Sequence, residues 1–520
     1  LKALFRPCAM MVPDFVFISE IMLFSGGFTT ASNLSVKLVA LFDLCRKQLS
    51  SADHYDWGLR AMKAILSTAG KAKRNDLNAD ESLLLLQVIR DCTSPRLISA
   101  DLPLFAGIIR DVFPEVNGTK EQPEKLIKYI KGAFMELNYR PIQLYLSKAV
   151  ELFETTLVRH GIMLVGGAMG GKSVSWRSLA SALTKQAADG EGQPVHVESL
   201  NPKAITIGEL YGAFNPVTSE WADGVLSKSI RECSFSEQTE LKWIIVDGPV
   251  DSLWIESMNS LLDDNKVLCL PNNERIQLGP HVKMVFEVDE LSQASPATVS
   301  RCGMVYFDPS TLPWTALADS WAAKKESQVM ATYVRGLMDN YIPQLVQFVQ
   351  FDGKSAIEIN PNFCVVSLLK IIDSFDDIIR EPIEKTVDGG EEVIKVDPLD
   401  HNNYFSLFAV NNDTVPFFQE EQLDVVYERI FVFAAIWAFG GTLIDQSRKT
   451  FDAFFKELCE TNKTRCALPS KLTIFDYFLD MAKMQWIPFC DGNTNFYFTE
   501  SKNLEEQLIP SNATAGPLFI

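Results

Sequence analysis

The sequence has no hydrophobic run long enough to cross a bilayer, and it has little positive charge. Its longest apolar run, IFVFAAIWAFGGTLI at 430–444, has fifteen residues, whereas a membrane span needs about 18 or more. We interpret this run as a buried helix and expect no membrane association. Lysine and arginine number 48 against 66 aspartates and glutamates, which gives a net charge of −18. That sign disfavours a surface that neutralises nucleic-acid phosphates.

Metal-ligand and disulfide patterns are also missing. The ten cysteines form no CxxC pair, and none of the five histidines stands at metal-ligand spacing. This usage favours reduced thiols in a cytosolic compartment over disulfides or zinc. We find no internal repeat at solenoid period and no long heptad run. The chain opens at Leu1 rather than Met and closes on PLFI, so we expect it to be a piece of a longer protein.

What the chain does have is the length and patterning of several folded units. Its 520 residues, 47% hydrophobic and 22% charged, predict three to five globular units. Apolar residues recur at helical spacing up to about residue 97 and again after 313. Between them, five strand-like runs alternate with helical or turn-rich sequence, which is typical of a parallel α/β sheet. These runs are GIMLV, PVHVESL, KWIIVD, VKMVFEV and GMVYF. The stretch KVLCLPNNERIQL predicts a hairpin inserted in this block.

The strongest motif is GGAMGGKS, which satisfies G-x-x-x-x-G-K-[ST] directly after the first strand-like run and directly before a helical pattern. Its residues are Gly166, Gly167, Ala168, Met169, Gly170, Gly171, Lys172 and Ser173. Backbone N–H groups of such a loop point at phosphate, the lysine reaches the terminal phosphates, and the hydroxyl can ligate Mg²⁺. We predict a site for ATP and Mg²⁺. A glycine-rich turn with an incidental lysine is the structural alternative.

A second carboxylate on the metal side is expected at the end of a neighbouring strand, and Asp247 closes KWIIVD in that manner. A solvent-facing aspartate at a strand end is the alternative. In P-loop motors of the AAA+ kind, the next residue is usually a glutamate that polarises the attacking water. Here it is Gly248, and general-base catalysis is worth roughly 10² to 10⁴ in rate. We therefore expect nucleotide to bind and stay, unless Asp251 substitutes as the base.

Several longer segments now carry a resemblance to a known family. NPKAITIGELYGAFNPVTSEWADGVLS, DGPVDSLWIESMNSLLDDNKVLCLPNNERIQL and SPATVSRCGMVY resemble the second AAA+ module of a dynein heavy chain, and LKALFRPCAMMVPDFVFISEIMLFSGGF resembles the end of the first. FVFAAIWAFGG, NNERIQL and TIFDYFLD are closer to axonemal outer-arm heavy chains. The resemblance covers nearly the whole chain. It implies the end of the first module at 1–97, the large α/β subdomain of the second at 98–312, its helical small subdomain at 313–462, and the start of the third at 463–520.

The resemblance also assigns roles by position. Arg301 becomes an arginine finger that acts in trans on ATP of the preceding module, whose own P-loop lies upstream of Leu1. Arg60, in HYDWGLRAMKAILSTAG, becomes the sensor of that first module, and Arg6 faces the last module of the ring. The second module of this family is thought to hold ATP as a structural or regulatory ligand, in keeping with Gly248. The usual sensor asparagine has no clear counterpart, the nearest residue being Asp289.

The sequence thus predicts part of the ATP-driven motor ring of an axonemal dynein, for minus-end-directed movement on microtubules. The expected partners are the other AAA+ modules of the same heavy chain and, through parts outside this chain, intermediate and light chains and microtubules. The expected location is the cytoplasm, the cytoskeleton and the axoneme of a cilium or flagellum. Two alternatives stay open. One is a free-standing active P-loop ATPase or kinase, which needs a catalytic carboxylate, and the other is a scaffold whose P-loop is vestigial.

Overall fold

The chain folds into two compact units, residues 1–312 and 313–520. The computed structural model describes residues 6, 8–11, 13–114, 123–235, 240–325, 327–356, 360–380, 387–388, 391–392, 420–480 and 485–488.

A five-stranded parallel sheet forms the centre of the first unit. Its strands are β1 (Gly161–Val165), β2 (Val195–Leu200), β5 (Leu241–Asp247), β8 (Val282–Val288) and β9 (Gly303–Tyr306), in the order β2-β5-β8-β1-β9. All five residues of β1 are buried, as expected of an interior parallel strand covered on both faces. The five strand-like runs and the parallel α/β architecture predicted from the sequence are confirmed.

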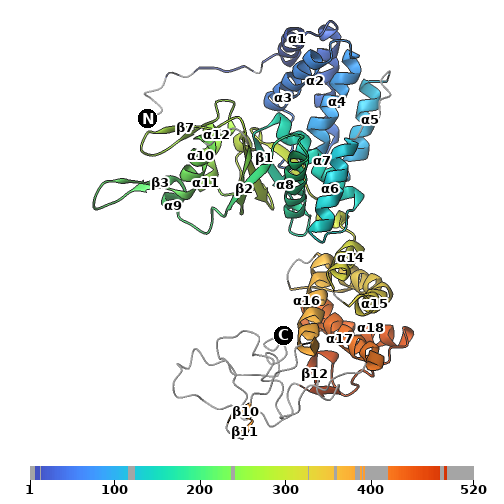
Figure 1. Cartoon of the computed structure of the whole chain (residues 1–520). Coiled ribbons are helices and arrows are strands. Elements are labelled where there is room, and N and C mark those ends of the chain that lie inside the picture. Colours follow the sequence, from blue (N-terminus) through green and yellow to red (C-terminus); the bar gives the residue numbers. More distant parts are fainter. Residues whose placement is uncertain are drawn as a thin grey trace. The chain divides into compact units, whose positions relative to one another are not determined.

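Helices cover both faces of this sheet (Figure 1). On one side pack α6 (Glu124–Glu136), α7 (Gln143–Val158) and α8 (Lys172–Ala188). On the other lie α10 (Val225–Phe235), α11 (Ser252–Ile255) and α12 (Asn259–Leu262). The short helices α9 (Ile207–Tyr211) and α13 (Pro296–Val299) complete the set. The carboxyl ends of β1, β5 and β8 are consequently left for loops, and this is the edge at which parallel sheets bind ligands.

Two antiparallel hairpins interrupt the α/β pattern. The first pairs β3 (Gly212–Phe214) with β4 (Trp221–Asp223) and the second pairs β6 (Val267–Cys269) with β7 (Arg275–Gln277). The second is the hairpin predicted at 266–278, which is thereby confirmed. Asn273 lies in its turn with a positive φ of 66°, a conformation that asparagine tolerates better than most residues.

The N-terminal helices of the first unit form their own apolar core. They are α1 (Phe15–Ser25), α2 (Ala31–Gln48), α3 (Leu59–Asn75), α4 (Glu81–Thr93) and α5 (Leu102–Val112), with a 3₁₀ turn at Ser94–Arg96. Asp14 caps α1 by accepting from the Val16 N–H at 2.9 Å. In α3, Met62, Ile65, Leu66 and Ala69 are buried and form one apolar stripe along the helix.

The second unit is mainly helical. It contains α14 (Trp314–Lys324), α15 (Gln328–Gln347), α16 (Pro361–Arg380), α17 (Glu420–Gly440) and α18 (Asp445–Thr461), with a short hairpin of β12 (Tyr477–Asp480) and β13 (Gln485–Pro488) and the two-residue pair β10 (Val387–Asp388) and β11 (Glu391–Glu392). Residues 430–439 of α17 are all buried, so the apolar run is a core helix as predicted. The sequence also predicts a loop rich in charge and glycine, KTVDGGEEVIKVDP at 385–398, and most of it lies outside the described residues.

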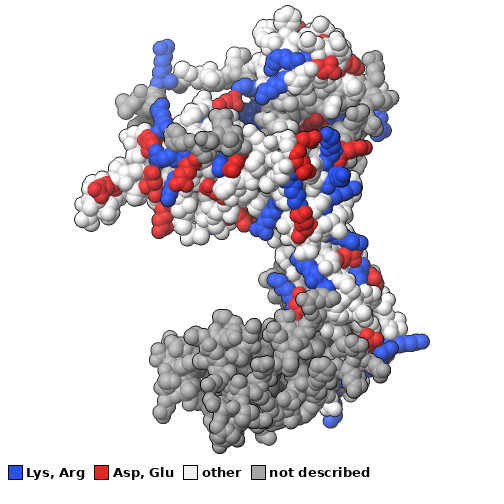
Figure 2. Space-filling model, in the orientation of Figure 1, with Lys and Arg blue, Asp and Glu red and all other residues white. Residues whose placement is uncertain are grey.

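The surface and the thiols agree with the composition. On the face in Figure 2, acidic and basic side chains of residues 13–312 are interspersed rather than gathered in a basic stripe. Within the described ranges, no helix is both long and apolar enough to span a bilayer. The nine cysteines in the same ranges form no disulfide with one another, and six of them are buried.

Candidate functional site

The GGAMGGKS segment forms a tight loop between β1 and α8. Gly166 has a φ of +149°, and a Cβ there would lie 1.9 Å from the Phe307 carbonyl oxygen. Gly171 has a φ of +89°, and its Cβ would meet the Tyr145 ring at 2.3 Å. Any side chain at either position is excluded both by backbone conformation and by space. The loop is therefore built around glycine in the manner of a phosphate cradle, and the fit to a triphosphate rests on this feature.

Lys172 begins α8, and its side chain is turned back into the loop. The ammonium donates to the carbonyl oxygen of Gly166, to that of Val288 at 3.1 Å and to Asp289 Oδ1 at 2.8 Å. The Lys172 side chain is 7% exposed, whereas that of Asp289 is 68% exposed. The ammonium thus lies inside the cradle, where terminal phosphates bind in P-loop proteins. Asp289 follows β8 as expected from the sequence and contacts this lysine.

Ser173 makes a contact that the sequence reasoning missed. Its hydroxyl donates to Glu287 Oε1, and the indole N–H of Trp176 donates to Glu287 Oε2 at 3.0 Å. Glu287 lies in β8 and is 9% exposed. The signal that could have revealed it is the interruption of VKMVFEV by one acidic residue, because interior parallel strands are normally apolar throughout.

Asp247 ends β5, and its strand neighbour in β8 is Glu287. Residues in register on adjacent strands present their side chains to the same face of the sheet. Partial burial raises the pKa of the Asp247 carboxyl, and the Glu287 carboxylate raises it further, while Lys172 acts in the opposite direction. The structure thus brings the predicted Asp247 and the P-loop lysine into one electrostatic site, together with a carboxylate that was not predicted.

Asp251, the alternative base expected near Gly248, makes two contacts of its own. Asp251 caps α11 by accepting from the Leu253 N–H at 3.0 Å, and it also pairs with Lys203. The hydrogen bond from Lys203 lowers the pKa of Asp251 below its usual value. A carboxylate that is engaged by a cation and held ionised by it is a weak proton acceptor.

The two arginines assigned by the resemblance lie close to each other. Arg60, near the start of α3, donates to Ser300 Oγ at 2.7 Å. Arg301 is the residue after Ser300. It donates through Nε to Asp263 Oδ1 at 2.7 Å and through Nη1 to the Ala297 carbonyl oxygen at 2.6 Å. Helix α3 is therefore docked against the segment that carries Arg301.

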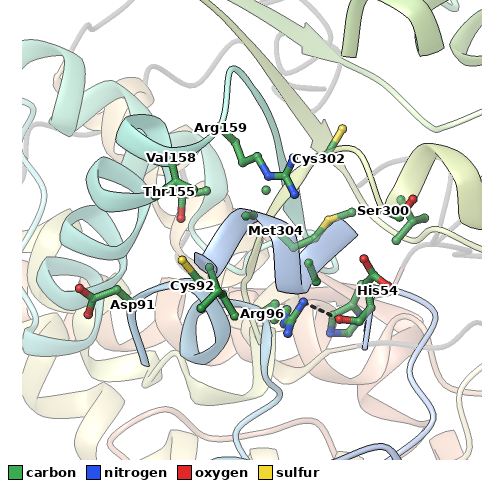
Figure 3. Close-up of a pocket in the computed structure, with 16 residues that line it drawn as sticks. His54, Asp91, Cys92, Arg96, Thr155, Val158, Arg159, Ser300, Cys302 and Met304 are labelled. Carbon is green, nitrogen blue, oxygen red and sulfur yellow. Dashed lines mark hydrogen bonds between the residues drawn. The ribbon is translucent and has the colours of Figure 1, made fainter. Parts of the chain in front are cut away.

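A second link and a small cavity mark the same junction. Lys63 of α3 donates to Asp264 at 2.6 Å. A cavity of about 50 Å³ lies nearby, lined among others by Arg96, Arg159 and Cys302 (Figure 3). The Arg96 guanidinium lies 4.6 Å from the Trp57 ring centroid and donates to the Asp56 carbonyl oxygen at 2.8 Å. Ligand pockets are typically 300–1,000 Å³, so this cavity is too small for a nucleotide.

The donor set of the P-loop suits Mg²⁺ bound together with phosphate. In the part of the chain that the structure describes, no group of three or more His, Cys, Asp or Glu side chains could hold a metal ion by itself. Mg²⁺ is usually held by one or two carboxylates and by phosphate oxygens, and a serine hydroxyl with an adjacent carboxylate fits that pattern.

Comparisons with known proteins cover most of the chain. Three family models match: hydrolytic ATP binding site of dynein motor region at residues 1–173, AAA domain (dynein-related subfamily) at 161–302, and dynein heavy chain AAA lid domain at 334–491. Dynein axonemal heavy chain 3 of Homo sapiens is 36% identical over 538 aligned residues that include 100% of this chain. The chain belongs to the dynein heavy chain family. The expectation of AAA+ modules is confirmed with it, and these modules imply nucleotide binding.

Other dynein heavy chains match to a similar degree. Dynein axonemal heavy chain 9 of Homo sapiens is 36% identical over 99% of this chain, and the ciliary dynein beta chain of Heliocidaris crassispina is 35% identical over 100% of it. The chain spans 12%, 10% and 11% of the lengths of these three relatives. The axonemal resemblance agrees with their names, while the outer-arm assignment stays a prediction.

Proposed function

We propose that this chain is part of the ATP-driven motor ring of an axonemal dynein, and that its own P-loop holds ATP with Mg²⁺ while hydrolysing it little or not at all. The observation that carries the proposal is the cradle at 166–173 with the Lys172 ammonium inside it. The names of the relatives support the motor context. Movement toward microtubule minus ends, the intermediate and light chains, and the axoneme of a cilium or flagellum belong to the same proposal.

Retention of ATP follows from what surrounds Asp247. The strand end offers a metal-side carboxylate, but Gly248 has no side chain with which to polarise water. Asp251 is held by Lys203 and by the start of α11. Removing a positioned general base is worth roughly 10² to 10⁴ in rate. This arrangement supports a nucleotide holder over the free-standing ATPase or kinase, and the Lys172 geometry supports a working cradle over a vestigial one.

Arg301 and Arg60 are proposed to serve a different nucleotide, the ATP of the preceding module. A guanidinium at such a boundary stabilises charge on the transferring phosphoryl group. Arg60 contacts Ser300, the residue before Arg301, so one neighbouring ligand could meet both. The division into the end of the first module, the second module in two subdomains and the start of the third is part of this proposal.

Removal of the Lys172 ammonium tests the nucleotide site. In the 520-residue chain, Lys172→Ala is expected to weaken Mg·ATP binding by on the order of a hundredfold or more, because a buried charge that faces phosphate is lost. Isothermal titration calorimetry measures the effect. Lys185→Ala, near the other end of α8, is the matched control and should bind like the unaltered chain. Equal binding by the Lys172 variant, or no binding by the unaltered chain, would contradict the proposal.

A further inference from the structure

Glu287 is a buried carboxylate in the floor of the nucleotide site. It lies in β8, a strand of mainly apolar residues that also contains Lys283 and whose burial pattern is nearly continuous. Its two hydrogen bonds come from the first turn and a half of α8, through Ser173 and Trp176. In the described part of the chain, no Lys or Arg nitrogen forms an ion pair with it; Lys172 pairs with Asp289 instead.

Packing alone does not account for a charged side chain at this position. A buried carboxylate is unfavourable unless hydrogen bonds or a cation compensate it. Neutral donors from Ser173 and Trp176 supply part of that compensation, and they leave the negative charge on the side of the sheet that faces the P-loop. Asp247 presents a second negative charge to the same face, in register with Glu287.

The contact with Ser173 connects this charge to the metal side of the site. In a P-loop, the hydroxyl at this position is the one that ligates Mg²⁺ beside the phosphates. In the present structure the Ser173 hydroxyl donates a hydrogen bond to Glu287. This hydrogen bond must break before the hydroxyl oxygen can ligate a cation. Glu287 then faces the cation position beside Asp247, and hard oxygen ligands of this kind are what Mg²⁺ prefers.

We propose that Glu287 is a second metal-side carboxylate of this site, and that with Asp247 it makes nucleotide binding depend on a divalent cation. The inference rests on the proposed function and deepens it. Metal-free ATP carries several negative charges and meets the carboxylates of Asp247, Glu287 and Asp289. The cations that act on this cluster are Lys172, which pairs with Asp289, and Arg177. With Mg²⁺ bound, two of the negative charges are neutralised and both metal-side carboxylates become attractive. The site is then a selective holder of the metal-bound triphosphate.

The measurement is the ratio of two ATP dissociation constants, one in excess EDTA and one in excess Mg²⁺, for the 520-residue chain. It has a single G-x-x-x-x-G-K-[ST] sequence. Glu287→Gln removes one negative charge from the floor of the site while keeping an oxygen that accepts from Ser173 or Trp176. We expect metal-free ATP to bind on the order of tenfold tighter in this variant, because one repulsive charge is gone. Mg·ATP should bind more weakly, so that the ratio falls by on the order of a hundredfold.

Glu290→Gln is the matched control, since it removes the same charge three residues further along, from an exposed side chain that accepts from Ser292. Its ratio should stay within about twofold of the unaltered chain. Glu287→Asp keeps the charge but shortens the side chain. The Glu287→Asp variant should bind metal-free ATP as weakly as the unaltered chain does, and it should bind Mg·ATP more weakly. This variant provides a second test if Glu287→Gln does not fold.

An unchanged ratio in a folded Glu287→Gln chain would overturn the inference, as would weaker binding of metal-free ATP by that variant. Either result leaves the proposed nucleotide site intact. Failure of the unaltered chain to bind ATP under any condition would instead remove the proposed function itself.

Mn²⁺ provides a readout independent of affinity for ATP. Its paramagnetic resonance signal in the ATP complex should show one fewer carboxylate ligand in Glu287→Gln and no change in Glu290→Gln.

Discussion

At the scale of single residues, the same chain holds one complete phosphate cradle and one arginine that is proposed to act elsewhere. Arg301 is held by Asp263 and by the Ala297 carbonyl oxygen, both within its own unit, and its side chain is 14% exposed. An arginine that is paired with a carboxylate must leave that carboxylate and bind phosphate before it can act in trans. Arg60 contacts Ser300, the residue before Arg301, so both arginines lie where α3 packs against this segment.

The proposed role of Arg301 as an arginine finger can be tested in the complete heavy chain. Arg301→Ala should lower steady-state ATP hydrolysis by on the order of 10³, because an arginine finger is worth about 10³ to 10⁵ in rate. Mg·ATP binding at the P-loop of this chain should stay within about twofold. Arg275→Ala, on the exposed side of β7, provides the comparison. Unchanged hydrolysis in the Arg301 variant would rule the role out.

The sequence predicted those parts of the site that depend on local sequence. Gly166 to Ser173 form a continuous motif flanked by a strand and a helix, so the cradle could be predicted before the fold was known. The contacts of Glu287 could not, because they depend on which strand lies next to β5 and on where α8 packs. The same holds for the approach of Arg60 to Ser300, which joins residues far apart in the chain.

At the scale of elements, one carboxylate connects three helices of the first unit. Glu81, at the start of α4, accepts hydrogen bonds from the backbone N–H groups and hydroxyls of Thr29 and Thr30, which precede α2 and follow α1. It also pairs with Lys73 of α3 at 3.5 Å. Burial alone would raise the pKa of Glu81, but the hydrogen bonds from Thr29 and Thr30 outweigh it and lower the pKa to about 2.

This contact should be visible in the pH dependence of unfolding. The pKa of Glu81 is lowered in the folded state. Its contribution to the free energy of unfolding is therefore present above its usual pKa of about 4.5 and is lost as the pH falls toward 2. Glu81→Gln is expected to cost about 1–3 kcal/mol at pH 7. The difference from the unaltered chain should shrink below pH 4.5 in urea titrations.

Glu124→Gln, in the exposed first turn of α6, serves as the control and should change the free energy of unfolding by less than about 0.5 kcal/mol. A difference between the Glu81 variant and the unaltered chain that stays constant between pH 7 and pH 3 would contradict the assignment. The helices themselves were predictable, since α3, α4 and α17 carry clear apolar spacing. The contacts of Glu81 were not predictable, because the sequence around Glu81 gives no indication that four donor groups of the distant Thr29 and Thr30 converge on its carboxylate.

At the scale of the whole molecule, the chain consists of two units with separate cores. The core of the second unit is dense in aromatic rings: Phe451 is fully buried and its ring centroid lies 5.3 Å from that of Phe348 and 5.6 Å from that of Phe455. The first unit carries the nucleotide site. The alternation of strands and helices predicted the α/β sheet, and the return to helical spacing predicted the helical second unit, because both patterns repeat over many residues.

Removal of the Phe451 ring should therefore destabilise the second unit and leave the first unit unchanged. Phe451→Ala is expected to destabilise residues 313–480 by about 3–5 kcal/mol, since a fully packed phenyl ring is lost. Hydrogen exchange followed by mass spectrometry should show faster exchange in α17 and α18 and unchanged exchange in β1 and α8. Mg·ATP should slow exchange in β1 and α8 in the same variant. Equal loss of protection in both units would contradict separate cores.

If the P-loop at 166–173 holds ATP without cleaving it, as proposed, the bound nucleotide stays a triphosphate. The 520-residue chain is loaded with Mg·ATP, freed of excess nucleotide, incubated, and denatured so that the released nucleotide can be separated and measured. We expect nearly all of it to be recovered as ATP after many minutes, with the same result for Asp251→Asn. Stoichiometric conversion to ADP within that time, dependent on Lys172, would contradict the proposal.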